Sequence, residues 1–282
     1  GTLQQMRDRI EPLTATVLRA PPYTLVLPRQ LAGRDARVLT NRPGSHPPPV
    51  DRVLFWLHGG GFVGGSPRSH ASMVARLARA AHLEAVMPSY RRAPEHTFPA
   101  APDDARAAFD ALVARGLSPG NIVIGGDSAG GNLVFGLLAG LLADGIRPAG
   151  VVAMSPATDL TFSGASIAEN ANSDTMLPVD RQGDIQAAYL GGADPTDPRA
   201  SPLFADFPDP PPVFVQYSTS EILRDDSLRI SERLRSFGAQ VTCDEWPDVP
   251  HDFTLFGGWV PEAREGIARA ARFIDGLWAE AD

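Results

Sequence analysis

The stretch around Ser128 has the residue types and spacing of a catalytic turn. Residues 122–134 read IVIGGDSAGGNLV, so the serine follows a short apolar run and precedes an apolar helical run. A serine on a sharp strand-to-helix turn has its hydroxyl lifted above the sheet, next to a helix N-terminus that stabilises negative charge. Side chains at Gly126 and Gly130 would collide with the neighbouring strand and helix. The motif therefore predicts that Ser128 is the nucleophile of an acyl-transfer reaction.

A second glycine-rich stretch, HGGGFVGGSPR, has two competing interpretations. Gly59, Gly61 and Gly64 match the G-x-G-x-x-G spacing of a dinucleotide-binding loop. Such a loop needs its third glycine in the first turn of a helix, and an acidic residue at the carboxyl end of the next strand. Here the helical period begins only near His70, and Glu84 lies at the start of its strand. The sequence therefore argues against a nucleotide cofactor.

The same stretch is better interpreted as the donor loop of an oxyanion hole. A tetrahedral intermediate needs hydrogen-bond donors where its negative charge develops. Because Gly60 and Gly61 have no side chains, their backbone N–H groups can face the same point as the N–H of Ala129. A flexible glycine turn would be the simpler interpretation if this loop stood alone, but the neighbouring GDSAGG motif favours the catalytic one.

Four further blocks carry a family resemblance. They are PSYRRAPEHTFPAAPDD (88–104), MSPATDL (154–160), DPRASPLFAD (197–206) and VPHDFTLF (249–256). With HGGG and GDSAGG, in this order, they resemble the hormone-sensitive-lipase-like bacterial esterases of the α/β-hydrolase superfamily. The resemblance implies an eight-stranded, mostly parallel sheet with helices on both faces and a helical cap. It also implies hydrolysis of carboxylic esters without a cofactor.

The resemblance assigns His251 as the general base and Glu221 as the acid that orients it. His251 follows the last predicted strand in PDVPHDF, where it can swing over Ser128, and the order Ser…acid…His is that of α/β-hydrolases. The other interpretation of His251 is a solvated loop histidine. His58 leads the oxyanion loop and is expected to brace it by hydrogen bonding. The remaining histidines have no catalytic context: His46, His70, His82 and His96.

The acid has several rivals. Glu221 stands where the family pattern after the seventh strand usually has aspartate, and a glutamate can also orient a histidine. Asp225 and Asp226 lie where helix caps belong, so we interpret them as structural. Asp248, three residues before His251, is the remaining alternative.

The elements that position these residues follow a repeating pattern. From about residue 50 onward, runs rich in Val, Ile and Leu alternate with segments of helical period, which is typical of parallel strands joined by crossover helices. Helical faces are clearest near 73–81, near 133–142 and after Pro261, which suits a first helical position. The predicted strands lie near residues 24–27, 36–40, 52–57, 84–88, 121–124, 150–154, 213–217 and 240–245. The fold class is therefore α/β.

Two segments do not fit the alternation. Residues 1–20 have apolar side chains at near-heptad spacing, although Pro12 must kink or split a helix there. Residues 161–212 are rich in Pro, Asp and Gly, with one helical piece from Asp180 to about Leu190. An insertion of this length is more often a lid over a site than an idle loop. We expect a single α/β-hydrolase domain over 1–282, with a cap built from about 1–20 and 161–212.

Composition narrows the class of partner. The chain has 282 residues, 43% of them apolar and 21% charged, and a net charge of −8, which argues against nucleic acid or an anionic membrane as partner. Cys243 is the only cysteine, and no H-E-x-x-H motif occurs, so no metal site is expected. No run of 18 apolar residues predicts a membrane span. We expect a cytoplasmic protein, compatible with a homodimer, that binds a small ester.

These features predict a serine carboxylesterase that works through an acyl-enzyme. We expect acyl chains of about two to eight carbons, because the insertion has no long exposed apolar helix of the kind that docks on lipid. An amidase or transacylase would use the same residues. A ligand-binding protein on this fold that has lost catalysis is the other alternative.

Overall fold

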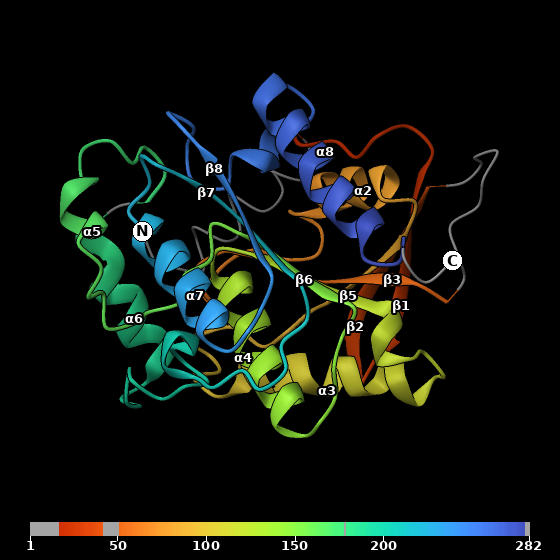
Figure 1. Ribbon diagram of the computed structural model, residues 1–282, viewed down its shortest axis with the longest axis horizontal. Helices are drawn as coiled ribbons and strands as arrows, with labels where there is room; N and C mark the ends of the chain where they lie inside the picture. Colours follow the sequence, from red (N-terminus) through yellow and green to blue (C-terminus); the bar gives the residue numbers. More distant parts are fainter. Residues whose placement is uncertain (1–16, 42–50, 178, 280–282) are drawn as a thin grey trace.

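The computed structural model describes residues 17–41, 51–177 and 179–279, whose strands form one sheet (Figure 1). The strands are β1 Thr24–Leu31, β2 Arg34–Asn41, β3 Val53–Leu57, β4 Glu84–Pro88, β5 Ile122–Asp127, β6 Gly150–Met154, β7 Val213–Ser218 and β8 Val241–Trp246. Their spatial order is β1-β2-β4-β3-β5-β6-β7-β8. The pairs β1–β2 and β2–β4 are antiparallel, and every other pair is parallel. The predicted eight-stranded, mostly parallel sheet is therefore confirmed.

Helices cover both faces of the sheet. They are α2 Ala71–Ala80, α3 Ala100–Ala114, α4 Ala129–Ala143, α5 Ser166–Glu169, α6 Gln182–Leu190, α7 Arg224–Ser236 and α8 Pro261–Gly276, with short 3₁₀ turns η1 Pro119–Asn121, η2 Val179–Arg181, η3 Pro202–Phe204 and η4 Phe253–Phe256. One core joins α3, α4 and α7 to the sheet, and a second core joins α2 and α8 to its opposite face (Figure 1). The central strands therefore lie between two layers of helices.

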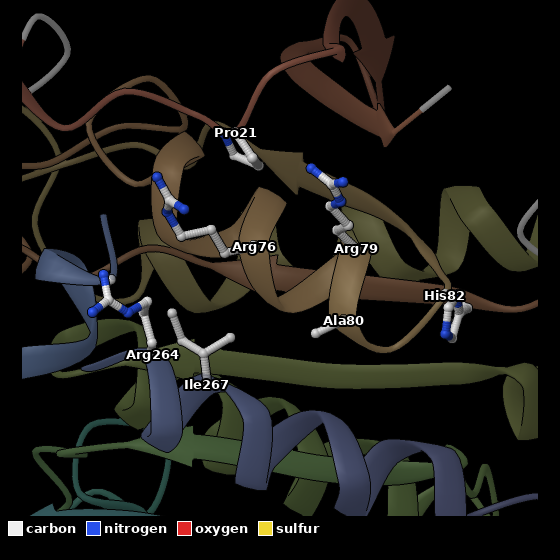
Figure 2. A pocket seen from close by; sticks show the side chains of 8 residues that line it. Pro21, Arg76, Arg79, Ala80, His82, Arg264 and Ile267 are labelled. Atoms are coloured by element: carbon white, nitrogen blue, oxygen red, sulfur yellow. The ribbon is translucent and has the colours of Figure 1, made fainter. Parts of the chain in front are cut away.

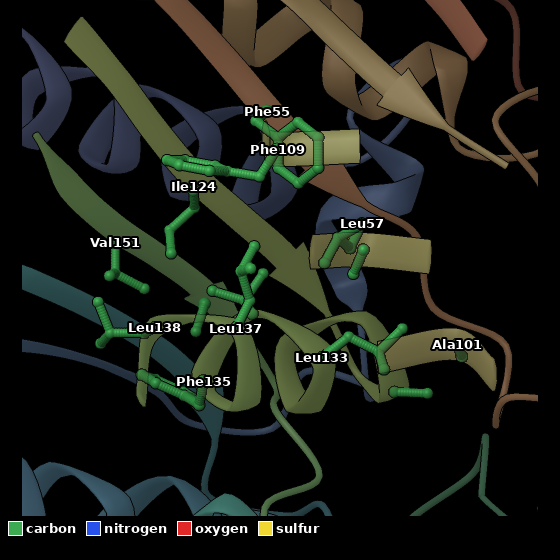
Figure 3. Close-up of a cluster of buried hydrophobic side chains, with 14 of the residues drawn as sticks. Phe55, Leu57, Ala101, Phe109, Ile124, Leu133, Phe135, Leu137, Leu138 and Val151 are labelled. Atoms are coloured by element: carbon green, nitrogen blue, oxygen red, sulfur yellow. The ribbon is translucent and has the colours of Figure 1, made fainter. Parts of the chain in front are cut away.

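Burial on both faces explains the continuous apolar sequences of the central strands. All five residues of β3, VLFWL, are buried. Phe55 and Leu57 belong to the core beneath α3 and α4, where the ring of Phe55 meets that of Phe109 edge-on at 6.1 Å (Figure 3). Trp56 belongs to the core beneath α2 and α8. Burying each such side chain contributes roughly 1.5–3 kcal/mol to stability, so the ends of these strands form a rigid platform.

The predicted elements agree with the structure to within a few residues. The strands predicted at 84–88 and 150–154 have those bounds, and Pro261 is the first residue of α8. The insertion over 161–212 contains α5, η2, α6 and η3. Because 1–16 of the expected N-terminal cap segment lie outside the described residues, the cap and the single-domain organisation stay predictions.

An open groove between α2 and α8 carries several basic side chains. Arg76 and Arg79 come from α2 and Arg264 comes from α8, around a cavity of about 380 Å³ (Figure 2). Burial and the two neighbouring guanidinium groups lower the pKa of Arg76. None of the residues that line this groove lines the cavity at Ser128, so the groove is not part of the site described next.

Candidate active site

Ser128 lies on a strained turn between β5 and α4. Its backbone has φ 51° and ψ −118°, a positive φ that residues with side chains rarely adopt. A Cβ atom at Gly126 would lie 2.5 Å from the carbonyl oxygen of Gly130, and one at Gly130 would lie 2.0 Å from that of Leu57. The steric reason given for both glycines is confirmed, and the surrounding structure holds the strain at this turn.

Ser128, His251 and Glu221 form a continuous hydrogen-bonded chain. The Nε2 atom of His251 is 3.0 Å from Oγ of Ser128, and its Nδ1 atom is 2.5 Å from Oε2 of Glu221. The exposed fractions of these residues are 7% for Ser128, 4% for His251 and 1% for Glu221. The structure therefore brings the predicted nucleophile, base and acid together, from the loops that follow β5, β8 and β7.

The turn after β7 fixes the carboxylate of Glu221 from several directions. Its Oε1 atom accepts the backbone N–H of Ser218 at 2.9 Å, which leaves Oε2 for His251. The carbonyl of Glu221 accepts a hydrogen bond from Nδ2 of Asn170 at 2.7 Å. The hydroxyl of Ser218 donates to the carbonyl of Val249 at 2.5 Å, which ties this turn to the loop that carries His251. The carboxylate can therefore hold the imidazole in the tautomer with hydrogen on Nδ1.

Asp225 and Asp226, two of the rivals for the triad acid, make contacts that hold the fold together and do not reach His251. Asp225 Oδ2 accepts the backbone N–H of Ser166 at 3.0 Å. The buried Asp226 accepts the backbone N–H groups of Thr158 at 2.6 Å and Asp159 at 2.9 Å. The expectation that these aspartates cap the helix is wrong, because both lie in the first turn of α7, inside its N-cap. They tie the insertion between β6 and β7 to this helix.

Asp248, the other rival for the acid, lies on the same loop as His251 but is exposed. It has a positive φ of 54° and makes no hydrogen bond or ion pair with His251. The neighbouring Asp252, which sequence reasoning missed, has its Oδ2 atom 3.1 Å from Nε2 of His251. Only its place next to a candidate base in the sequence could have drawn attention to it.

The proposed oxyanion donors lie beside Ser128. Gly60 and Gly61 have φ values of 119° and 61°, which favour glycine, and a Cβ atom at Gly60 would lie 2.5 Å from the backbone of Gly64. Within the described chain, the N–H groups of Gly60, Gly61 and Ala129 donate to no protein acceptor. Ala129 is the first residue of α4, whose N-terminus carries partial positive charge. These groups are available to a substrate oxygen.

Asp127 anchors the glycine loop from the residue next to Ser128. Its carboxylate accepts the backbone N–H of Gly59 at 2.8 Å and the indole N–H of Trp56 at 2.8 Å. His70 Nε2 lies 3.0 Å from the same carboxylate. Although burial favours the neutral acid, the charge and hydrogen bond of His70 lower the pKa of Asp127. His70, for which no catalytic role was predicted, thus has a structural partner, and nothing in the local sequence indicated one so far along the chain.

His58 braces the glycine loop as predicted. Its Nδ1 atom is 2.8 Å from the carbonyl oxygen of Gly59, and its ring stacks on that of Tyr90 at 4.3 Å. The hydroxyl of Tyr90 donates to the carbonyl of His58 at 2.7 Å. Burial, aided by the charge of His70, lowers the pKa of His58 to about 3, so this imidazole is neutral. Its role is structural.

A small cavity opens beside Ser128. Its volume is about 80 Å³. Apart from Ser128 and two glutamines, the lining is apolar or backbone: Gly61, Phe62, Ala129, Ala157, Leu160, Phe162, Leu177, Ile185 and Leu223. Leu177 and Ile185 come from the insertion between β6 and β7. An apolar pocket next to a nucleophile suits the hydrocarbon part of a substrate.

Among residues 17–41, 51–177 and 179–279, no group of three or more His, Cys, Asp and Glu side chains is arranged to hold a metal ion. In the same ranges, no helix has the length and apolar character needed to cross a bilayer.

A strained serine, a buried histidine and a carboxylate on this fold define a serine hydrolase. The sequence matches the alpha/beta hydrolase fold family over residues 54–255, and the chain belongs to that family. It is 36% identical over 224 residues to an acetyl-hydrolase of Streptomyces hygroscopicus, covering 79% of this chain and 75% of that protein. It is 34% identical over 228 residues to an esterase of Acinetobacter venetianus, covering 80% of this chain and 75% of that protein.

Solved structures give the same result. The crystal structure of an esterase from the bacterial hormone-sensitive lipase family has a TM-score of 0.92 and 35% identity, covering 98% of this chain and 92% of that one. EstE5 soaked with p-nitrophenyl butyrate has a TM-score of 0.93 and 34% identity, covering 99% of this chain and 92% of that one. The resemblance to hormone-sensitive-lipase-like esterases is therefore confirmed, and the protein is an ester hydrolase of the serine hydrolase class.

Proposed function

We propose that this protein hydrolyses short-chain carboxylic esters. Ser128 is the nucleophile, His251 is the general base, and Glu221 orients His251. The backbone N–H groups of Gly60, Gly61 and Ala129 bind the oxyanion. The observation that carries the proposal is the buried chain from Ser128 Oγ through the imidazole to Glu221, with gaps of 3.0 and 2.5 Å.

The geometry supports a two-step mechanism. His251 Nε2 takes the hydroxyl proton as Ser128 Oγ attacks the ester carbonyl, and the free N–H donors stabilise the resulting oxyanion. The imidazolium then gives this proton to the leaving alcohol, which leaves an acyl-enzyme on Ser128. Water attacks the acyl-enzyme with the same base, and the carboxylic acid leaves.

The preference for short acyl chains is supported by the cavity of about 80 Å³ and by the names of related proteins. One relative is an acetyl-hydrolase, and another, from Pseudomonas putida and 31% identical over 249 residues, is an ethyl acetate hydrolase. A panel of p-nitrophenyl esters of increasing acyl length tests this preference. Faster hydrolysis of an emulsified long-chain triglyceride than of the soluble butyrate ester would contradict it.

Ser128→Ala tests the nucleophile. The variant should lose ester hydrolysis and still fold, because the hydroxyl is chemically essential and Ser128 lines the cavity. A serine-directed phosphonate should label Ser128 in the wild type and nothing in the variant. Ser118→Ala is a matched control, since Ser118 is exposed and its hydroxyl makes no hydrogen bond in the described structure. Normal turnover by Ser128→Ala would refute the assignment.

Matched ester and amide substrates separate the remaining alternatives. Higher kcat/KM for the amide would indicate an amidase, and an acyl-enzyme burst with an activated ester would exclude a binding protein that has lost catalysis. A cytoplasmic location and a homodimer also stay predictions. Sedimentation of the purified protein tests whether it is a homodimer.

A further inference from the structure

A second carboxylate lies against the histidine of the proposed triad. Asp252 is 6% exposed, and its Oδ2 atom is 3.1 Å from Nε2 of His251. The same nitrogen faces Oγ of Ser128 at 3.0 Å. The other carboxylate oxygen of Asp252 is buried without a hydrogen-bond partner within the described structure. The imidazole therefore has a carboxylate on each of its two nitrogens.

The surroundings of Asp252 leave His251 as its closest cation. The β5–α4 turn contributes Asp127, which is already paired with His70, and the turn after β7 contributes Glu221. Although burial lowers the pKa of His70, the charge of Asp252 adds to the effect of Asp127 in raising it. After β6, Ser155 Oγ lies 3.5 Å from the backbone N–H of Asp252, a marginal hydrogen bond. Neither Asp127 nor Glu221 can neutralise Asp252, because both are acidic.

This contact matters because a proton on Nε2 removes the lone pair that Ser128 needs. As a base, neutral His251 must accept the hydroxyl proton of Ser128 through the lone pair of Nε2. When His251 carries a second proton, its positive charge lies in ion-pair contact with the Asp252 carboxylate, whose Oδ2 atom is 3.1 Å from Nε2. In that form the imidazole has no lone pair for Ser128.

The neighbouring carboxylates favour the form in which His251 is protonated and paired with Asp252. Burial lowers the pKa of His251, but the Asp252 and Glu221 carboxylates outweigh burial and raise it well above the usual value. Burial raises the pKa of Asp252 to about 6, even though the neighbouring His251 charge opposes the rise. One proton is thus shared between the two groups and must leave before His251 can act as a base.

We propose that Asp252 is a positioning residue that holds the second proton on His251, beside Ser128, and so sets the acid limit of activity. The inference rests on the proposed roles of Ser128 and His251. Loss of one proton from the pair to solvent frees the Nε2 lone pair and activates the enzyme.

The test is the pH profile of Asp252→Asn and Asp252→Gly. Both changes remove the charge, and both residues tolerate the positive φ of 52° at this position. The midpoint of the acid limb should move to lower pH by about 1 to 3 units, since an opposite charge in contact shifts a pKa by that amount. Each profile is scaled to its own alkaline plateau, because a weaker base also lowers turnover modestly.

Asp248→Asn is a matched control. Asp248 is in the same loop, also has a positive φ, and is exposed, so its replacement should leave the acid limb unchanged. The rate of inactivation by a serine-directed phosphonate against pH gives the same midpoint without substrate. Thermal melts show that each variant is folded.

Three results would overturn the proposal. The first is an acid limb that stays in place in the folded Asp252 variants, and the second is an equal shift in Asp248→Asn. The third needs no variant: a wild-type inactivation midpoint at or below about 6.5, the value of an ordinary histidine, would show that no carboxylate holds the proton on His251. Failure of the proposed function would look different, because Ser128→Ala would then keep its turnover.

Discussion

Replacing Glu221 with glutamine keeps the shape of the side chain and removes its charge. The consequence depends on which end of the amide faces His251. Oε1 of Glu221 accepts the backbone N–H of Ser218 at 2.9 Å, so the amide oxygen of glutamine will remain there. The amide NH₂ then faces Nδ1 of His251, where Oε2 now lies at 2.5 Å.

An NH₂ group at this position selects the wrong tautomer. Nδ1 must accept its hydrogen bond, so the imidazole proton moves to Nε2 and that nitrogen can no longer accept from Ser128. The charge that stabilises the imidazolium is lost as well. For a buried triad acid, the same change lowers kcat by on the order of 10² to 10⁴, which corresponds to about 3 to 5 kcal/mol of transition-state stabilisation. Turning the amide over would place its NH₂ against the N–H of Ser218, which is also unfavourable.

The assay is kcat for a soluble butyrate ester together with a thermal melt of each protein. Glu221→Gln should melt near the wild type. Asp225→Asn keeps an oxygen for the N–H of Ser166, and Asp248→Asn changes an exposed side chain, so both should keep most of their activity. Near-normal kcat for Glu221→Gln, beside a large loss for Asp225→Asn or Asp248→Asn, would show that the acid is misassigned.

Two further predictions concern other parts of the chemistry. Activity should be unchanged by chelators, because the proposed mechanism uses no metal ion; loss in EDTA that a divalent ion restores would contradict it. Burial raises the pKa of Asp226 from 3.8 to about 7, despite the backbone N–H groups of Asp159 and Thr158, so its contribution to stability is complete below pH 3.8 and is lost as pH rises through about 7. Asp226→Asn should therefore melt higher than the wild type at about pH 8 and not at about pH 4, and an equal change at both pH values would refute this reasoning.

The sequence predicted the sheet because its central strands are buried on both faces. Runs such as VLFWL in β3 and GVVAM in β6 alternate with segments of helical period, which is typical of parallel strands between helices. The sequence also predicted the turn at Ser128. A side chain at Gly126 or Gly130 would clash with neighbouring backbone, so the motif by itself indicated the conformation of the turn.

What the sequence could not predict depends on contacts between distant segments. His70 and Asp127 lie 57 positions apart and meet only because α2 begins and β5 ends beside the same loop. Asp225 and Asp226 precede an apolar helical run, which is the local pattern of a cap. Their carboxylate oxygens nevertheless accept hydrogen bonds from backbone N–H groups of the insertion. A cap and a tertiary anchor use the same residue types, and only the fold distinguishes them.

The insertion between β6 and β7 has two roles that are coupled through its backbone. It contributes Leu177 and Ile185 to the cavity beside Ser128. It also clamps the turn that carries Glu221, since Asn170 donates to the Glu221 carbonyl at 2.7 Å and Ser166 donates to that of Ile222 at 2.7 Å. A change that enlarges the acyl pocket by moving this segment will therefore also move the acid behind the base. Acyl-chain preference and kcat are coupled through the backbone of this turn, whereas substitutions confined to side chains of α6 can alter the pocket and leave the acid in place.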